Sequence, residues 1–368
     1  MLSQFGFVGM KWMKKTWVSI PDVLFFQEGP GVRNTQYTIV GVKLLNVANL
    51  VDGKIDLSTS DRYISEKEAY GKYKHFLCDA GDFIIASSGI KVEYIDKKMG
   101  FVDESMLPLC MNTSTIRFKV LDEKQLRIRY FMYYLKSEHF KQQLFKQITG
   151  SAQLNYGPSH LKKMIMPLID LNDQDEIVSC MDKVQNIIEK RQQELYRLDD
   201  LIKARFVEMF GNPRLNEKGF KCKKGFELFK ISNGKAVSNE KRFESGIPAY
   251  GGNGISWYTN TVLFEEDTIV IGRVGFQSGN VHFVKGPMWI TDNAMYISEL
   301  YDDSLSLVFL CDMMEQIDFT RDQDAGDLKK VTQKPFMEME YILPEKSLQK
   351  EYIDFVHQVD KSKFMKSF

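Results

Sequence analysis

Residues 174–210 read QDEIVSCMDKVQNIIEKRQQELYRLDDLIKARFVEMF, and this stretch decides how the chain is organised. Its apolar residues recur at alternating steps of four and three, the spacing by which one helix packs along a second helix. Gly211 and Pro213 follow, and this pair is typical of a helix end. At about 1.5 Å per residue the helix would be roughly 55 Å long. The predicted seam consists of Ile177, Met181, Val184, Ile188, Leu195, Leu198 and Ile202, with Arg191 interrupting it.

The sequences on the two sides of this helix repeat one another, and such a repeat determines the domain organisation. Residues 81–86 (GDFIIA) and 266–271 (EDTIVI) both join an acidic turn to an apolar run that is typical of a buried strand. In each half there follow a helix-like apolar pattern, a polar loop with glycine, a short strand closed by proline, and a glutamine that opens a helix. The paired landmarks are Ile128 and Leu307, Gly150 and Gly326, Pro167 and Pro344, and Gln174 and Gln349.

This order predicts an α+β fold with two β-rich globules, each followed by a long helix, and with the two helices paired antiparallel. We expect the first globule over 1–172, the first helix over 173–211, the second globule over 212–346 and the second helix over 347–368. From Gln349 to the last residue there are only 20 positions, so the second helix is shorter than the first. The early seam near Ile177, Met181 and Val184 is therefore expected to lack a partner helix. A second helix truncated from a longer parent is the alternative.

The composition is that of a well-packed protein without a membrane span. Hydrophobic residues make up 43% and charged residues 27%, which argues against disorder. No apolar run approaches the roughly 18 residues of a membrane helix, and the first residues lack the features of a signal peptide. The five scattered cysteines form no C-x-x-C pair and are expected to be reduced, as in the cytoplasm. Equal numbers of basic and acidic residues, 49 each, leave DNA binding open, because only one face must be positive.

The sequence contains none of the common patterns of reactive residues. It has no phosphate-binding G-x-x-x-x-G-K-[ST] loop, and neither H-E-x-x-H nor a spaced Cys/His set for a metal. Residues 212–214 (NPR) follow the long helix and differ from the Asn/Asp-Pro-Pro-aromatic loop of amino-methyltransferases. We therefore predict a binding protein with no catalytic residues, no metal and no cofactor of its own.

Several stretches in both halves match the pattern of one known protein family. In the first half these are residues 27–33 (QEGPGVR), 36–37 (QY), Gly41 and 81–82 (GD). In the second half they are residues 247–254 (IPAYGGNG), 271–275 (IGRVG) and 289–294 (WITDNA), and the end of the first helix, 204–211 (ARFVEMFG), matches as well. Together these stretches resemble the specificity subunits of Type I restriction-modification systems. The resemblance covers nearly the whole chain and includes the order of globule, helix, globule and helix.

The resemblance implies that each globule is a target-recognition domain that reads one half of a bipartite site in double-stranded DNA. It also implies that the helices set the spacing of the two half-sites and dock two modification subunits, which methylate adenine with S-adenosylmethionine. Motor-nuclease restriction subunits would complete a cytoplasmic complex for phage defence. On this basis we expect a methyltransferase subunit to cover the early seam of the first helix.

Candidate DNA contacts are polar side chains on loops flanked by glycine. Arg or Lys suits guanine, Asn or Gln suits adenine, and Ser, Thr or Tyr suits phosphate. Arg273 is the strongest candidate, because it directly follows a predicted buried strand. Tyr250 could equally belong to the core, and Asn253 could serve a left-handed turn. The full set is Arg33, Ser87, Ser88, Lys91, Gln153, Asn155 and Tyr156 in the first half, and Lys235, Tyr250, Asn253, Arg273, Gln277 and Asn293 in the second.

Three other functions remain open from the sequence. A stand-alone relative could bind half-sites or oppose restriction without a methyltransferase. An enzyme, either a nuclease or a base-modifying protein, could carry a site of unfamiliar pattern. A coiled-coil adaptor would need no DNA at all. Copurification distinguishes these functions, because a specificity subunit should retain a methyltransferase, whereas an enzyme should act alone.

Overall fold

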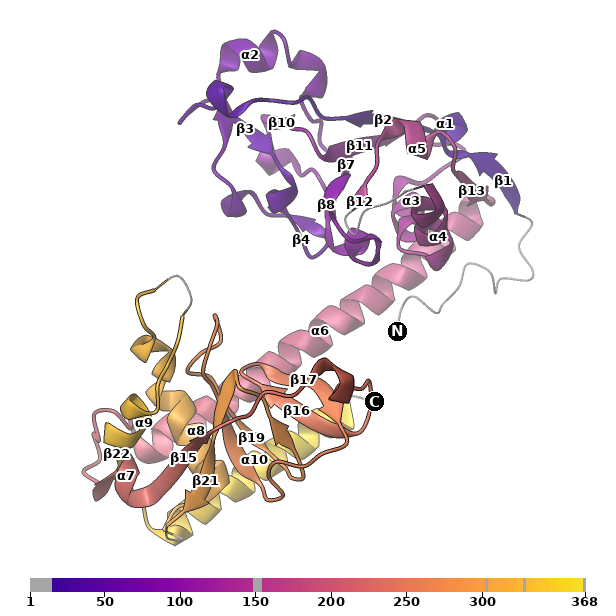
Figure 1. Cartoon of the computed structure of the whole chain (residues 1–368). Helices are drawn as coiled ribbons and strands as arrows, with labels where there is room; N and C mark the ends of the chain where they lie inside the picture. The colour runs from indigo at the N-terminus through magenta and orange to yellow at the C-terminus, as the bar shows by residue number, and fades with distance from the viewer. Residues whose placement is uncertain (1–14, 148–153, 302–303, 327–328, 367–368) are drawn as a thin grey trace. The chain divides into compact units, whose positions relative to one another are not determined.

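The computed structural model describes residues 15–147, 154–301, 304–326 and 329–366 (Figure 1). The chain divides into two compact units, residues 1–187 and 188–368. The division falls within the long helix α6 (Leu171–Phe210), which therefore contributes to both units.

The first unit is built on a four-stranded antiparallel sheet with strand order β2-β11-β7-β9. These strands are β2 (Leu24–Glu28), β11 (Thr115–Val120), β7 (Phe83–Ala86) and β9 (Met99–Phe101). A smaller sheet has the order β10-β3-β6, in which β10 (Leu109–Met111) runs parallel to β3 (Val42–Leu45) and β6 (Tyr63–Ile64) runs antiparallel to it. The remaining strand pairs are β1 (Thr16–Ser19) with β13 (Ile165–Leu168), β4 (Leu50–Val51) with β5 (Lys54–Ile55), and β8 (Ser88–Ile90) with β12 (Leu154–Asn155). Its helices before α6 are α1 (Ile20–Val23), α2 (Glu66–Tyr70), α3 (Ile128–Leu135), α4 (Glu138–Gln147) and α5 (Pro158–Leu161).

The second unit repeats this plan and confirms the predicted duplication. Its main sheet has the order β15-β21-β18-β19, and its smaller sheet the order β17-β16-β20 with β20 parallel to β16. The strands are β15 (Phe229–Asn233), β21 (Ala294–Leu300), β18 (Thr268–Gly272), β19 (Val281–Val284), β16 (Ile247–Gly251), β17 (Gly254–Thr259) and β20 (Trp289–Ile290). The pair β14 (Cys222–Lys224) and β22 (Glu340–Ile342) corresponds to β1 and β13. The helices after α6 are α7 (Gly225–Leu228), α8 (Leu307–Ile317), α9 (Lys334–Glu338) and α10 (Lys346–Lys366).

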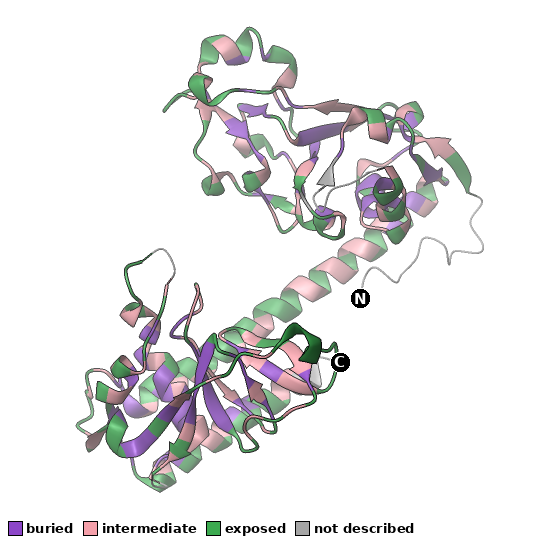
Figure 2. Cartoon of the chain, viewed as in Figure 1, coloured by how far each residue is buried: buried purple, intermediate pink, exposed green. Residues whose placement is uncertain are grey.

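The apolar runs that revealed the duplication form the central strands of the two main sheets. Every residue of β7 and of β18 is buried (Figure 2). Neighbouring strands satisfy their backbone groups on both sides, so a continuous, mostly apolar run can stay out of water. The predicted apolar helices are α3 and α8, which contribute many of the buried side chains of their units.

In both units a glutamine ties the start of a long helix to the start of a shorter one. Gln174 Oε1 accepts the backbone N–H of Arg127 at the start of α3, and its Nε2 donates to two carbonyl oxygens. Gln349 Oε1 accepts the backbone N–H of Ser306 at the start of α8, and its Nε2 likewise donates to two carbonyls. Both glutamines are buried, and each satisfies one of the N–H groups that a helix leaves open at its beginning.

The second half of α6 and α10 pack antiparallel within the second unit. Asp199 forms an ion pair with Lys363 at 2.7 Å, and Arg205 forms one with Glu351 at 2.9 Å, so the two helices run in opposite directions. Phe206 and Tyr352 meet edge to face in the same contact. Helix α6 has 40 residues and α10 has 21, as the predicted difference in length requires.

The expectation that a methyltransferase subunit covers the early seam of α6 is wrong for two of its residues. Ile177 is 7% exposed, and Met181 packs against the core of the first unit. Two ion pairs fix this part of the helix to the segment at α3, Arg127 with Asp175 at 2.9 Å and Arg129 with Asp182 at 2.6 Å. The first globule itself therefore covers the beginning of the helix. Val184, Ile188, Leu195, Leu198 and Ile202 are all partly exposed.

Candidate nucleic-acid interface

In the second unit three loops meet, and two of them approach closely because glycines at the contact carry no side chain. A Cβ atom on Gly252, in the turn between β16 and β17, would lie 3.0 Å from the Cα atom of Gly272. A Cβ atom on Gly272 would lie 2.4 Å from the carbonyl oxygen of Gln277. Only glycine permits such close approach. The turn at residues 251–254 is thereby held against the connection between β18 and β19.

The third loop joins β20 to β21 and lies against the residue that follows β18. The backbone N–H of Arg273 donates to the carbonyl oxygen of Asn293 at 2.9 Å, and the carbonyl of Arg273 accepts from Val331 at 3.0 Å. The backbone of Arg273 is thus held from two sides while its side chain is exposed. Asn253 and Asn293 are exposed as well.

Lys235 joins this group from the segment after β15. Its backbone N–H donates to the carbonyl of Ile290 at 2.9 Å, and its own carbonyl accepts the indole N–H of Trp289 at 2.9 Å. The side chain of Lys235 is exposed. We call Lys235, Asn253, Arg273 and Asn293 the second-unit interface, since their backbones adjoin one another around residues 290–294.

The two other candidates of the second unit have internal contacts. Tyr250 is half-buried against a small core cluster that includes Val270 and Ile290, and burial raises its pKa. Of the two readings of Tyr250, the core position is therefore the one found. Gln277 is also half-buried, and its Oε1 accepts a hydrogen bond from Asn280.

Two candidates of the first unit point into the globule, which corrects their assignment as DNA contacts. Ser87 is 0% exposed, and its hydroxyl donates to Glu28 at 3.3 Å. Tyr156 is 2% exposed, its hydroxyl donates to the carbonyl of Ala86 at 3.0 Å, and burial raises its pKa well above the ordinary value. Ser87 directly follows the buried strand β7, and the Tyr156 hydroxyl bonds to the last residue of that strand. The hydroxyl groups of both residues therefore have their hydrogen-bond partners inside the fold.

The loops of the first unit nevertheless repeat the arrangement of the second. The N–H of Ser87 donates to the carbonyl of Ser114, as that of Arg273 does to Asn293. A Cβ atom on Gly29 would lie 2.0 Å from the carbonyl oxygen of Asn112, and one on Gly234 would lie 2.0 Å from that of Thr291.

The remaining candidates of the first unit belong to this region or to the loop after β2. Arg33 and Lys91 are exposed, and Ser88 is half-buried in β8 opposite Asn155 of β12. Val32, beside Arg33, donates its N–H to Asn112 Oδ1 at 3.2 Å. Gln153 and the side chain of Asn155 lie outside the described residues.

Sequence reasoning missed an aromatic residue beside the second-unit interface. Phe276 is 87% exposed on the connection between β18 and β19. The sequence signal for Phe276 was its place between Gly275 and Gly279, in a loop that already held two candidates. In the structure both glycines adopt positive φ. Lys329 and Lys330 were also missed. Lys330 forms an isolated antiparallel β-bridge with Val274, and the carbonyl of Lys329 accepts a hydrogen bond from the backbone N–H of Gly275 at 2.8 Å.

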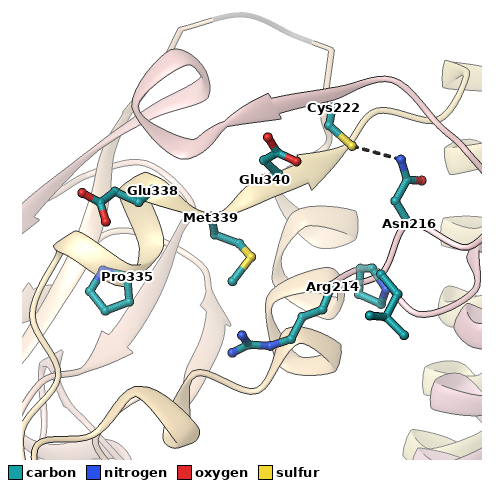
Figure 3. Close-up of a pocket in the computed structure, with 9 residues that line it drawn as sticks. Arg214, Asn216, Cys222, Pro335, Glu338, Met339 and Glu340 are labelled. Carbon is teal, nitrogen blue, oxygen red and sulfur yellow. Dashed lines mark hydrogen bonds between the residues drawn. The ribbon is translucent and has the colours of Figure 1, made fainter.

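A pocket of about 380 Å³ lies elsewhere in the second unit (Figure 3). It is lined by residues 213–216, Cys222, Pro335 and 338–340, and it contains none of the candidate residues. Burial raises the pKa of Cys222, which also accepts a hydrogen bond from Asn216 Nδ2 at 3.3 Å, so the pocket does not favour a reactive thiolate. Within the described ranges no group of His, Cys, Asp and Glu is arranged to hold a metal ion. Among the helices described, none is long and apolar enough to cross a membrane.

Comparison with known proteins gives one consistent family. Residues 34–197 and 217–366 each match the model of the Type I restriction modification DNA specificity domain. The chain is 25% identical over 186 residues to the Type I restriction enzyme MjaVIII specificity subunit of Methanocaldococcus jannaschii, a match over 50% of this chain and 42% of the relative. It is 30% identical over 143 residues to the EcoprrI specificity subunit of Escherichia coli, over 34% of this chain and 33% of the relative. These matches thus span less than half the length of either relative.

Two solved structures share the fold. The Type I restriction-modification S subunit from M. genitalium has a TM-score of 0.53 at 18% identity, covering 97% of this chain and 92% of that one. A structure describing complex assembly and conformational transition of the Type I system has a TM-score of 0.52 at 15% identity, covering 96% and 93%.

Proposed function

This chain belongs to the Type I restriction modification DNA specificity family, and from that premise we propose that each unit reads one half of a bipartite site in double-stranded DNA. The observation that carries the proposal is the second-unit interface. Four exposed side chains, from four segments far apart in the sequence, adjoin one another around residues 290–294. Packing of the globule does not require them there, because none of them is buried.

The residue types in this interface suit base edges and phosphates. Arg273 can donate two parallel hydrogen bonds to guanine, and Asn253 and Asn293 can each pair with adenine. Lys235 suits a phosphate, which would position the unit without selecting a base. The first unit offers Arg33, Ser88 and Lys91 in the corresponding loops, so the duplicated fold supplies two readers with different side chains.

The chemistry of modification and cleavage belongs, in this proposal, to partner subunits in the cytoplasm. Two methyltransferase subunits would bind the middle of α6, where Ile187 is 59% exposed and Tyr196 is 71% exposed. They would bring S-adenosylmethionine, and restriction subunits would bring the motor and nuclease. The buried position of Ile177 moves the expected docking surface away from the start of the helix.

Methylome sequencing of the host with and without this gene tests the proposal. We expect one bipartite adenine-methylated sequence to disappear when the gene is deleted and to return when it is restored. Copurification of a methyltransferase with the tagged chain should accompany it. An unchanged methylome, from a host that retains its methyltransferase genes, would contradict the assignment.

A further inference from the structure

Phe276 is the most exposed aromatic side chain among the described residues. Its backbone, in contrast, is held firmly. Gly275 donates its N–H to Lys329, Ser278 donates to Gly275, and the side chain of Gln323 donates to the carbonyls of Phe276 at 3.3 Å and Ser278 at 2.6 Å. The loop therefore presents the ring to solvent from a fixed position, without using it in the core.

The surroundings of Phe276 point to DNA as its partner. Arg273 precedes it by three residues in the same connection, and Lys330, on the adjoining segment, is exposed. The glycine contact between residues 252 and 272 places the turn that carries Asn253 against this connection. An apolar ring among basic and amide groups matches a nucleic-acid groove better than an apolar protein surface.

The first unit carries an exposed aromatic at the corresponding connection. Residues 87–98 join β7 to β9 as residues 273–280 join β18 to β19, and Tyr94 within them is 51% exposed. Lys97 Nζ lies 5.6 Å from the centre of the Tyr94 ring, and Lys91 begins the same turn. The two copies differ in loop length and in sequence here, yet both place an aromatic ring beside positive charge.

We propose that Phe276 is a specificity-determining residue that packs against the C5-methyl group of a thymine in the major groove of the second half-site. A phenyl ring has no hydrogen-bonding group, and this methyl is the apolar feature by which the major groove distinguishes one base pair from the others. The inference rests on the proposed function, since it assumes that the second unit reads DNA. It adds a requirement: the second half-site must contain an A·T pair next to the base read by Arg273.

The test combines Phe276→Ala with removal of the methyl group from the DNA. On the target found by methylome sequencing, each thymine of the second half-site is replaced in turn by uracil, and binding by the complete methyltransferase complex is measured. We expect one replacement to weaken wild-type binding about three- to tenfold, as loss of one buried methyl group would. Phe276→Ala should weaken binding to thymine DNA by at least that factor and should be insensitive to the same replacement.

Phe226→Ala is the matched control, because Phe226 is a 53% exposed aromatic on α7 of the same unit. It should bind as the wild type does. A second half-site without A·T pairs, or equal uracil sensitivity of Phe276→Ala and the wild type, overturns the inference. As a further check, 2-aminopurine is placed in the second half-site, where its fluorescence rises when the base is unstacked. A rise that requires Phe276, together with no effect of uracil on binding, would show that the ring wedges between bases, and it also overturns the inference. If the wild-type complex bound all DNA sequences equally, the proposed function itself would be refuted.

Discussion

Arg273 combines a fixed backbone with an exposed side chain, whose guanidinium donates to the carbonyl of Asp292 at 3.4 Å. The choice between base and phosphate can be tested on this residue. If it pairs with guanine, Arg273→Ala should cost about 1–3 kcal/mol of binding free energy and relax specificity at one base pair. If it contacts phosphate, all sequences should weaken equally and the salt slope should fall by about one. Binding of the assembled complex to single-base variants at several salt concentrations measures both.

Lys350→Ala provides the control for this substitution, because Lys350 is an exposed cation on α10. It removes the same charge from the same unit and should leave affinity and preference unchanged. An Arg273→Ala complex with wild-type affinity and preference would remove Arg273 from the interface.

Asp312 on α8 makes the stability of the second unit depend on pH. Burial raises its pKa to about 7, although the hydroxyl of Tyr352 donates to its Oδ2 at 2.9 Å. The unfolded chain loses this proton near the ordinary pKa of 3.8, so the folded state binds more protons between about pH 4 and pH 7. The contribution of Asp312 to stability is therefore present below pH 4 and is lost as pH rises through 7.

Asp312→Asn should consequently stabilise the second unit at pH 8 by roughly 1–3 kcal/mol, since the amide keeps an acceptor for Tyr352 and needs no ionisation. The gain should shrink at pH 5. Urea unfolding at the two pH values measures it, with the exposed Asp354→Asn on α10 as control. A gain that is equal at pH 5 and pH 8 would show that ionisation of Asp312 is not its cause.

At the scale of elements, Gln174 and Gln349 each help to join a long helix to its globule. Gln349→Ala would remove the present partner of the buried carbonyl of Pro344 and of the partly buried N–H of Ser306. We expect a loss of about 2–4 kcal/mol in the free energy of unfolding, because unsatisfied buried groups bear the full cost of desolvation. Gln358→Ala, on an exposed face of α10, should change it by less than about 0.5 kcal/mol. Equal effects of the two substitutions in urea unfolding would contradict this role.

Helix α6 has a buried part that stabilises the second unit and an exposed part that we propose binds the methyltransferase, and mutations can distinguish the two. Phe206, stacked on Phe309, belongs to the core of the second unit, whereas Ile187 and Tyr196 are exposed. Ile187→Asp and Tyr196→Asp should leave unfolding of the isolated chain within about 0.5 kcal/mol of wild type, because both sites are already in water. Copurification of the methyltransferase should nevertheless decrease.

Tyr301→Asp serves as the comparison for this experiment, because Tyr301, the residue directly after β21, is 48% exposed. It adds the same charge and should retain the methyltransferase. If Ile187→Asp and Tyr196→Asp both retain it as well, the middle of α6 is not the docking surface.

For the whole molecule, the duplication predicts that specificity is modular. Each unit has its own sheets, its own core and its own loops, and helix α6 contributes residues to both. Replacing residues 212–344 with the equivalent globule of a relative should change one half of the methylated sequence and leave the other intact. Methylome sequencing of the host that carries the hybrid reads the result directly. A hybrid that alters both halves would show that the units do not read independently.

The sequence by itself determined the duplication, the fold class and the two long helices. These depend on local patterns: apolar steps of three and four along α6, mostly apolar runs in β7 and β18, and a glutamine at the fourth residue of both α6 and α10. Periodicity is a property of neighbouring residues, so it can be read without knowing what packs against them. The same periodicity placed Ile177 on a helix, and Ile177 does lie in α6.

Only the tertiary structure decided what covers each face and which loop residues point outward. Ile177 is buried by the first globule and not by a partner helix, because the segment at α3 is brought to it from 45 to 50 residues away. Ser87 and Arg273 follow equivalent buried strands and make the same backbone hydrogen bond, yet one side chain is buried and the other is exposed. The difference arises because Glu28, on the neighbouring strand β2, accepts the hydroxyl of Ser87. Exposure of a polar side chain depends on partners distant in sequence, and spacing alone does not contain them.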